Sequence, residues 1–376
     1  MTIVTVGISL VNSLKTFDII WIMTQGGPAR SSETLAVTMY RETFVILHHG
    51  YGAAIAVVLS AIVIAVSWLY LSRSLERELR VERQAPRGFT SLLAAVGRLV
   101  RWPLALIQQV IGTVLDAILG VLVMLLPGRI VRHVVLLILG LTWLLPIYLF
   151  LINAVSSSED YARKERWEPP KGFALADNIA DAWNFARLGQ AVGSTLFYAV
   201  AGALLAVLIA ALAAFAIASL RIFFGFFWFM VIYTGTIFPF QMYLSPLYTM
   251  YVRWNLYNTH LGLLIFYTAI AVPFATFVIR NHFTSIPPDL TEAARLDGAS
   301  ALTAFRHIFV PLSLNAFATV FILQFTWIWN DLLFGLTLSR SEEIRPIMAA
   351  LAALQGQFAR TGPPVALAGA LLVSLP

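Results

Sequence analysis

Residues 287–311 read PPDLTEAARLDGASALTAFRHIFVP and lie between two long apolar stretches of the chain. The start of this segment has the chemistry of a helix N-terminus. Asp289 can cap a helix by accepting hydrogen bonds from backbone N–H groups, and Glu292, three residues later, completes a pattern like a capping box. The segment therefore predicts a helix that begins at Asp289.

The rest of the segment predicts where that helix ends and which element comes next. Ala293 and Ala294 favour helix and place only small side chains on one of its faces. Gly298 suits a helix end that requires a positive φ. A second element, over residues 301–309, then leads into the next apolar stretch. We expect a short, exposed helix with small residues on its surface, held between two longer helices.

The composition of the whole chain indicates a membrane environment. Apolar residues make up 59% of the 376 residues and charged residues only 12%, whereas a soluble domain has about 25% charged residues. A helix needs about 20 mainly apolar residues to cross the hydrocarbon core. The sequence predicts an all-α, polytopic helical membrane protein with clear spans at residues 51–71, 130–152, 191–220, 226–244, 262–279 and 312–333.

The distribution of arginine predicts the orientation of these spans. The net charge is +6, and only Lys15, Lys164 and Lys171 are lysines. Arginines beside spans mark cytoplasmic loops, which places residues 287–311 in the cytoplasm and the polar loop at 156–187 outside. The apolar stretch at 104–126 contains two glutamines and an aspartate. We favour a helix in the cytoplasmic interface there, with a true span as the alternative.

Several classes of chemistry are excluded or lack their usual motifs. Cysteine is absent, which excludes disulfides and thiolate metal sites. None of the three lysines lies in the Gly-Lys-Ser/Thr context of a phosphate-binding loop. His48 and His49 are adjacent and not four residues apart on a helix face. We expect no enzyme, no metal site and no cofactor in this chain, and the basic charge is not a nucleic-acid signal.

The segment at 287–311 also resembles a known signature. Its strings Glu-Ala-Ala and Asp-Gly-Ala, with an isoleucine and a proline further on, are similar to the EAA loop of binding-protein-dependent ABC importer permeases of the carbohydrate (MalFG-type) family. The resemblance implies the type I permease fold and a helix that seats in a groove of a separate ATPase. The docking residues it implies are Glu292, Ala293, Ala294, Asp297, Gly298, Ala299, Ile308 and Pro311.

The resemblance divides the chain into three parts. Residues 131–376 resemble the MalG-type subunit, with the docking loop at 287–311 and a last helix that looks truncated. Residues 1–72 resemble the C-terminal end of a MalF-type subunit, because they contain SLKTFDIIW at 13–21 and MTQGGP at 23–28. Residues 73–130 are expected to form a basic cytoplasmic linker with an interfacial helix. Whether the join is a natural fusion or a gene-boundary artefact stays open.

The resemblance also implies partners. These are an ATP-binding cassette ATPase dimer that binds ATP and Mg, a second permease subunit and an extracytoplasmic sugar-binding protein, all at the bacterial plasma (inner) membrane. The expected function is a permease subunit of an ATP-driven sugar importer with alternating access. The alternative is a non-transporting scaffold or receptor that retains ATPase docking. Which sugar or polyol is carried stays open.

A polar and aromatic cluster near the outer end of the span at 312–333 is a candidate for the substrate path. It contains Trp327, Trp329, Asn330 and Asp331, and Gln241 on a neighbouring span is a weaker candidate. Aromatic rings stack on the C–H faces of sugars, while amides and carboxylates hydrogen-bond to hydroxyl groups. The competing interpretation is an interfacial aromatic belt with an aspartate at a helix end.

Overall fold

The computed structural model describes residues 13, 16–79, 128–220, 222–236, 240–355 and 361–374, and these form helices and no strands. The segment at 104–126, for which an interfacial helix is predicted, lies outside these residues.

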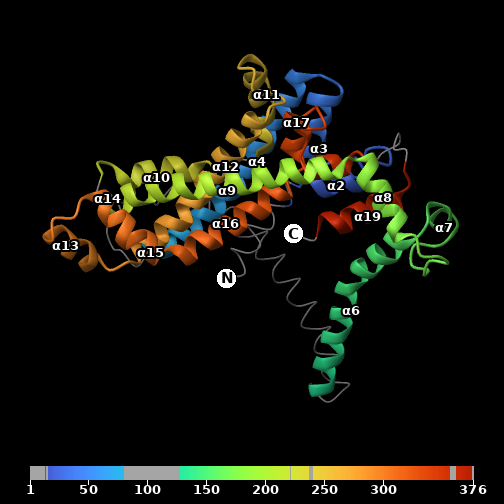
Figure 1. Ribbon diagram of the computed structural model, residues 1–376, viewed down its shortest axis with the longest axis horizontal. Helices are drawn as coiled ribbons and strands as arrows, with labels where there is room; N and C mark the ends of the chain where they lie inside the picture. Colours follow the sequence, from blue (N-terminus) through green and yellow to red (C-terminus); the bar gives the residue numbers. More distant parts are fainter. Residues whose placement is uncertain are drawn as a thin grey trace.

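Three long helices form the centre of the molecule: α9 (Leu188–Ser219), α12 (His260–Thr284) and α16 (Leu314–Trp329). They run side by side along the longest axis (Figure 1). Small residues let them approach closely, as is common between membrane helices. Ala199, Ala203 and Ala206 of α9 are fully buried. A Cβ added to Gly202 would lie only 3.2 Å from Cδ1 of Ile328 on α16.

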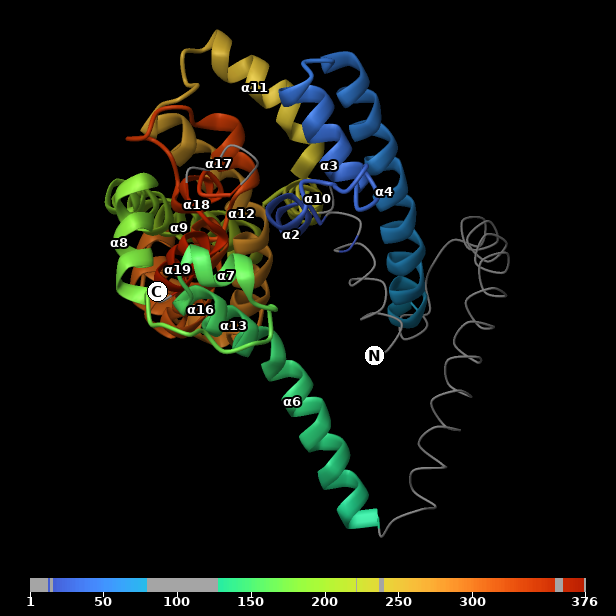
Figure 2. The same cartoon turned by 90° about the vertical axis from the view of Figure 1, so that its right-hand side faces the viewer.

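The structure confirms most of the expected spans. The helices His133–Val155, within α6 (Gly128–Val155), α9 and α12 are each long and apolar enough to cross a membrane, and Ala301–Leu312 with Leu314–Trp329 forms a fourth candidate bent by 73°. The span at 51–71 lies within α4 (His49–Leu79). None of the most apolar window of α6 is buried, and this helix extends away from the rest (Figure 2).

One expected span differs in its structure from the others. The apolar stretch at 226–244 is not a continuous helix, because α10 (Gly225–Thr234) ends before η2 (Phe240–Tyr243), a short 3-10 turn, and α11 (Leu244–Arg253) follows. Pro246 lies in the first turn of α11, where its missing N–H costs no intrahelical hydrogen bond. The stretch is therefore a broken helix.

The N-terminal segment packs into the same core as the central helices. It contains α2 (Asp18–Met23), α3 (Leu35–Tyr40), the π-helical turn η1 (Arg41–Val45) and α4. Phe44 meets Tyr248 of α11 edge to face, with ring centroids 5.7 Å apart. Aromatic pairs of this geometry stabilise packing beyond their buried area.

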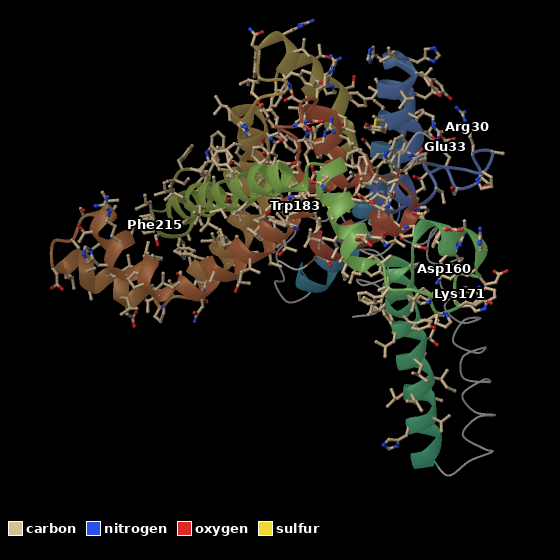
Figure 3. All side chains as sticks on the ribbon, turned by 45° about the vertical axis from the view of Figure 1, so that its right-hand side comes forward. Arg30, Glu33, Asp160, Lys171, Trp183 and Phe215 are labelled. Carbon is tan, nitrogen blue, oxygen red and sulfur yellow. The ribbon has the colours of Figure 1, made fainter. Side chains whose placement is uncertain are left out.

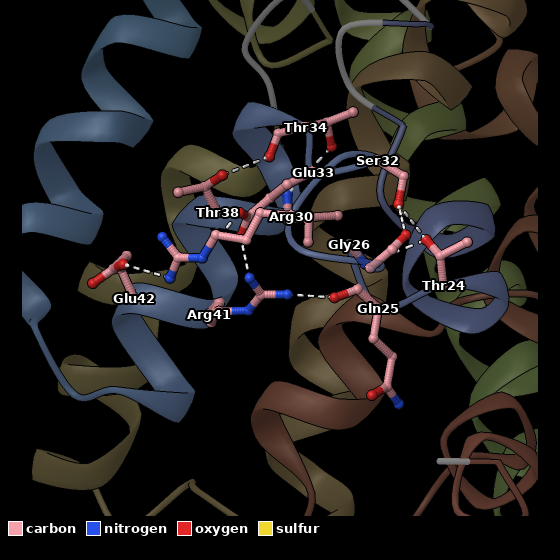
Figure 4. A network of polar contacts seen from close by, with 12 residues as sticks. Thr24, Gln25, Gly26, Arg30, Ser32, Glu33, Thr34, Thr38, Arg41 and Glu42 are labelled. Atoms are coloured by element: carbon pink, nitrogen blue, oxygen red, sulfur yellow. Dashed lines mark hydrogen bonds and ion pairs between the residues drawn. The ribbon is translucent and has the colours of Figure 1, made fainter. Parts of the chain in front are cut away.

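A network of charged side chains fixes the loop between α2 and α3 (Figure 4). Arg41 pairs with Glu33 and donates to the carbonyl of Gln25. Arg30 lies 3.5 Å from Glu33 and 3.8 Å from Glu42. Because both glutamates are buried and each has an arginine partner, the network can hold this loop in one arrangement.

The shorter helices gather at the two ends of the central bundle. At one end are α7 (Ser158–Arg163), α8 (Leu175–Phe185), α17 (Leu333–Leu338), α18 (Ile347–Ala352) and α19 (Pro363–Val373). At the other are α13 (Pro288–Leu296), α14 (Ala301–Ala304), the π-helical turn η3 (Phe305–Phe309) and α15 (Val310–Leu312). Figure 3 places Phe215 near the second end and Asp160 and Lys171 at the first.

Candidate functional site

The loop at 287–311 begins with the exposed helix that the sequence predicts, but its N-terminus differs. Pro287 is the N-cap of α13, Pro288 is in its first turn, and no side chain caps the helix. The expected cap at Asp289 is therefore wrong. Proline suits the first helical position because its fixed φ is already helical and its absent N–H would be unpaired there. Asp289 instead lies within the first turn, where its charge favours the helix dipole.

The C-terminus of α13 is closed by Gly298, as expected. Gly298 has a φ of +77°, and Asp297 is the C-cap. The N–H of Gly298 donates to the carbonyl of Arg295 at 3.1 Å, and the N–H of Ala299 donates to that of Ala294 at 2.9 Å. These two bonds form a Schellman motif, which satisfies helix carbonyls that would otherwise lack partners.

The second half of the loop anchors it to the central helices. Ser300 caps α14 by accepting a hydrogen bond from the N–H of Thr303 at 3.2 Å. Phe309 is buried, and its ring centroid lies 4.9 Å from that of Phe215 on α9 and 5.1 Å from that of Phe283 on α12. Phe305 also contacts Phe215, at 5.1 Å. Four aromatic rings from three elements thus fix the base of the loop.

One arginine of α13 forms a hydrogen bond that attaches the exposed helix to α9. Nη2 of Arg295 donates to the carbonyl of Ser219 at 3.3 Å. Ser219 is the last residue of α9, whose terminal carbonyls have no partner within the helix and carry partial negative charge. The contact places a cation at a helix C-terminus and links the loop directly to the longest central helix.

The expected docking residues lie together on this loop, and most of them are exposed. Ala294, Ala299 and Ile308 are half-buried, whereas Glu292, Ala293, Asp297, Gly298 and Pro311 are exposed. Leu296 is 89% exposed.

The aromatic and polar cluster at the other end of α16 is held by contacts within the chain. Trp329 is buried, its Nε1 donates to the carbonyl of Val373 at 3.2 Å, and its ring stacks on that of Phe325. Trp327 is half-buried, with its ring 5.6 Å from that of Phe240. Both tryptophans therefore have structural partners.

The two polar members of the cluster differ in burial. Asp331 is buried and accepts hydrogen bonds from the hydroxyl of Tyr267 at 2.9 Å and the N–H of Gly335 at 3.0 Å. Asn330 is exposed and donates to the carbonyl of Thr326 one turn back. Through these contacts Asp331 links Tyr267 of α12 to the first turn of α17. A role in the substrate path stays a prediction for both residues.

Gln241 belongs to η2, and its side chain lies outside the described part of the structure, so its place in the substrate path stays a prediction. A cavity of about 350 Å³ lies between α11 and α12. This cavity is lined by apolar side chains and small residues, among them Tyr243, Phe266 and Pro273. Among the described residues, no group of three or more His, Asp or Glu side chains is arranged to hold a metal ion.

Comparison with known proteins identifies the family. Residues 206–375 match the family described as "Binding-protein-dependent transport system inner membrane component". The melibiose/raffinose/stachyose import permease protein MelC of Bacillus subtilis is 31% identical over 233 residues, which cover 62% of this chain and 83% of MelC. The chain belongs to this family.

Two further comparisons extend this permease assignment. The "Probable ABC transporter permease protein PH1216" of Pyrococcus horikoshii is 41% identical over 142 residues, 38% of this chain and 51% of that protein. The crystal structure of a bacterial ABC transporter involved in the import of the acidic polysaccharide alginate superposes with a TM-score of 0.55 at 24% identity, over 69% of this chain and 91% of that one. The fold is that of a multi-pass ABC importer permease.

Sequence reasoning missed two features of the loop at 287–311. The first is the bond between Arg295 and Ser219, whose partners are 76 residues apart. The second is the exposed leucine Leu296. The only signal for it was an apolar residue in the last turn of a helix that the sequence predicts to be exposed.

Proposed function

We propose that this permease subunit couples carbohydrate import to a separate ATP-binding cassette ATPase through the loop at 287–311. The single observation that carries the proposal is the exposed α13, closed at Gly298 and anchored by Phe305 and Phe309 to α9 and α12. A force applied to this helix would act on the central helices, because Arg295 is hydrogen-bonded to Ser219 of α9 and the base of the loop packs on α9 and α12. Carbohydrate as cargo is supported by the relative MelC, whose name specifies three oligosaccharides.

The proposal includes three partners. An ATPase dimer would bind ATP and Mg and receive α13 in a groove, a second permease subunit would complete the pore, and an extracytoplasmic binding protein would deliver the sugar. Alternating access of the pore would follow closure of the ATPase dimer. This chain supplies the docking surface and part of the path, and the ATPase carries the chemistry.

The docking surface is tested by placing a charge on it. Leu296→Glu changes a side chain that is 89% exposed, so the fold is expected to survive. The matched control is Leu47→Glu, at a leucine that is 65% exposed near the start of α4, away from the docking loop. The variants are co-expressed with an ATP-binding cassette ATPase and a second permease subunit from the same organism, and are purified by a tag on this chain.

We expect Leu296→Glu to lose the ATPase during purification and Leu47→Glu to retain it. Equal recovery of the ATPase with both variants would contradict docking at α13. Uptake of labelled raffinose into proteoliposomes then separates the two functions considered for this chain. ATP-dependent uptake supports import, whereas ATPase binding and hydrolysis without uptake of any saccharide tested would favour a non-transporting scaffold.

A further inference from the structure

A second cavity, of about 380 Å³, lies at the end of the bundle opposite the docking loop. Its walls come from α2, from the connection between α11 and α12, from α17 and α18, and from the loop between these two helices. Figure 2 shows α2, α17 and α18 gathered at this end. The volume falls within the range of about 300–1,000 Å³ that is typical of ligand pockets.

Asn258 holds one side of the loop that lines this cavity. Its Oδ1 accepts hydrogen bonds from the N–H of Arg340 at 2.7 Å, and from the N–H and hydroxyl of Ser341 at 2.9 and 3.1 Å. Its own N–H donates to the carbonyl of Leu338 at 3.0 Å. One asparagine side chain thus organises the backbone at the point where Arg340 enters the cavity wall.

Helix α9 holds the other side of the loop. The hydroxyl of Ser194 donates to the carbonyl of Glu343 at 2.6 Å, and that of Tyr198 donates to the carbonyl of Ile344 at 2.9 Å. With both sides fixed, the loop presents its side chains in a defined geometry before any ligand arrives. Such preorganisation lowers the entropy lost on binding.

The loop brings two guanidinium groups to the cavity, those of Arg340 and Arg345. Nη2 of Arg345 donates to the backbone carbonyl of Arg340 at 2.8 Å. Within the described part of the chain, neither guanidinium lies within 4.0 Å of a carboxylate. The acidic neighbour Glu342 pairs with Arg187 instead, at 2.8 Å. The cavity wall therefore carries two positive charges with no ion-pair partner there.

Two aromatic rings complete the walls. Trp21 is held by stacking on Phe17, at 5.4 Å, and by an edge contact with Tyr40, at 4.9 Å. Tyr257 lines the same cavity as Arg340, and its ring meets that of Tyr248 edge to face, with centroids 5.2 Å apart. Ala349, Ala352 and Ala353 leave the rest of the lining small.

We propose that this cavity binds an anionic sugar unit. A guanidinium forms paired hydrogen bonds with the oxygens of a carboxylate or phosphate, and an aromatic ring packs against the C–H face of a pyranose. Arg340 and Arg345 hold the anionic group, and Trp21 supports the ring. The inference rests on the proposed import of carbohydrates and specifies a class of cargo for it.

Binding is measured by isothermal titration of the purified full chain in neutral-lipid nanodiscs, with glucuronate, glucose 6-phosphate and glucose as probes. The variants are Arg340→Gln and Arg345→Gln, with Arg163→Gln as the matched control, because Arg163 is an exposed arginine on α7 paired with Glu159. Ala353→Phe fills the cavity from an exposed position without removing charge. If an arginine variant is unstable, Ala353→Phe still tests whether the probe binds in this cavity.

We expect an anionic probe to bind at least about tenfold more tightly than glucose. The difference arises because glucose has no charged group to contact the arginines. This preference should disappear in both arginine variants and in Ala353→Phe, and persist in Arg163→Gln. A preference for glucuronate over glucose 6-phosphate would identify the anion as a carboxylate, and the reverse as a phosphate.

Equal binding of glucose and both anions, no binding of any probe, or an anion preference retained in Arg340→Gln and Arg345→Gln would overturn the proposal. No ATPase is present in this titration. Failure of docking at α13 would therefore leave the binding result unchanged, and a failed titration would leave the docking result unchanged.

Discussion

Substitution of Gly298 tests whether the closed end of α13 is required for docking. A Cβ added at this position would meet no atom within 4 Å. A Cβ at position 298 would therefore not clash with the rest of the chain. The cost of the substitution would come from strain in the backbone. At a φ of +77°, an ordinary residue is strained by roughly 1–2 kcal/mol.

The size of the expected effect follows from that strain. A free-energy change of 1–2 kcal/mol changes a local equilibrium by about 5–30-fold. Adopting a negative φ at residue 298 would break the hydrogen bonds from Gly298 to Arg295 and from Ala299 to Ala294. If the ATPase binds only the closed helix end, its apparent affinity falls in proportion to the population of that form. We expect Gly298→Ala to weaken docking by up to about 5–30-fold.

The series Gly298→Asn, Gly298→Ala and Gly298→Val separates conformation from contact. Asparagine tolerates the left-handed region and should stay close to the natural chain, whereas a β-branched valine should be the weakest. The assay titrates the ATPase subunit against the assembled permease in nanodiscs and follows stimulated ATP hydrolysis. Natural affinity in the valine variant would refute the reasoning. So would equal damage from asparagine and valine, since bulk alone would then explain the loss.

Two further pairs of variants test the ends of α16. Phe309→Ala removes a buried ring and should lower stability by about 3–5 kcal/mol, whereas Leu302→Ala on the exposed face of α14 should stay within about 0.5 kcal/mol; thermal unfolding in nanodiscs measures both, and equal melting temperatures would contradict the anchoring role. Asp331→Ala leaves the hydroxyl of Tyr267 unpaired at a cost of about 1–3 kcal/mol, whereas Asn330→Ala should have little effect on the same measurement. A more harmful Asn330→Ala would reverse the assigned roles.

Local chemistry predicted the parts of the docking loop that depend on neighbouring residues. The conformation of Gly298 follows from its place after a short helix, because few other residues adopt a positive φ at low cost. The helix start was misplaced because two signals compete there. Asp289 has the capping side chain, but Pro288 has the fixed φ of a first helical residue. A proline immediately before a capping residue favours the earlier start.

Features that depend on distant partners could not be read from the sequence. The hydrogen bonds of Asp331 and Trp329 are an example, because their partners Tyr267 and Val373 are 64 and 44 residues away. The break in the helix at 226–244 could not be predicted from the sequence either. A continuous span and a broken one bury the same apolar side chains, so hydropathy alone does not distinguish them.

Helix α9 connects the two sites proposed for this permease. Its C-terminal carbonyl at Ser219 accepts a bond from Arg295 of the docking helix, and near its other end Ser194 and Tyr198 hold the loop that carries Arg340. The helix has 32 residues and is therefore about 48 Å long. Coupling between sites requires an element whose position both of them influence. Since both ends of α9 are attached by hydrogen bonds and the helix between them is continuous, α9 is the element through which a displacement imposed at α13 would reach the cavity loop.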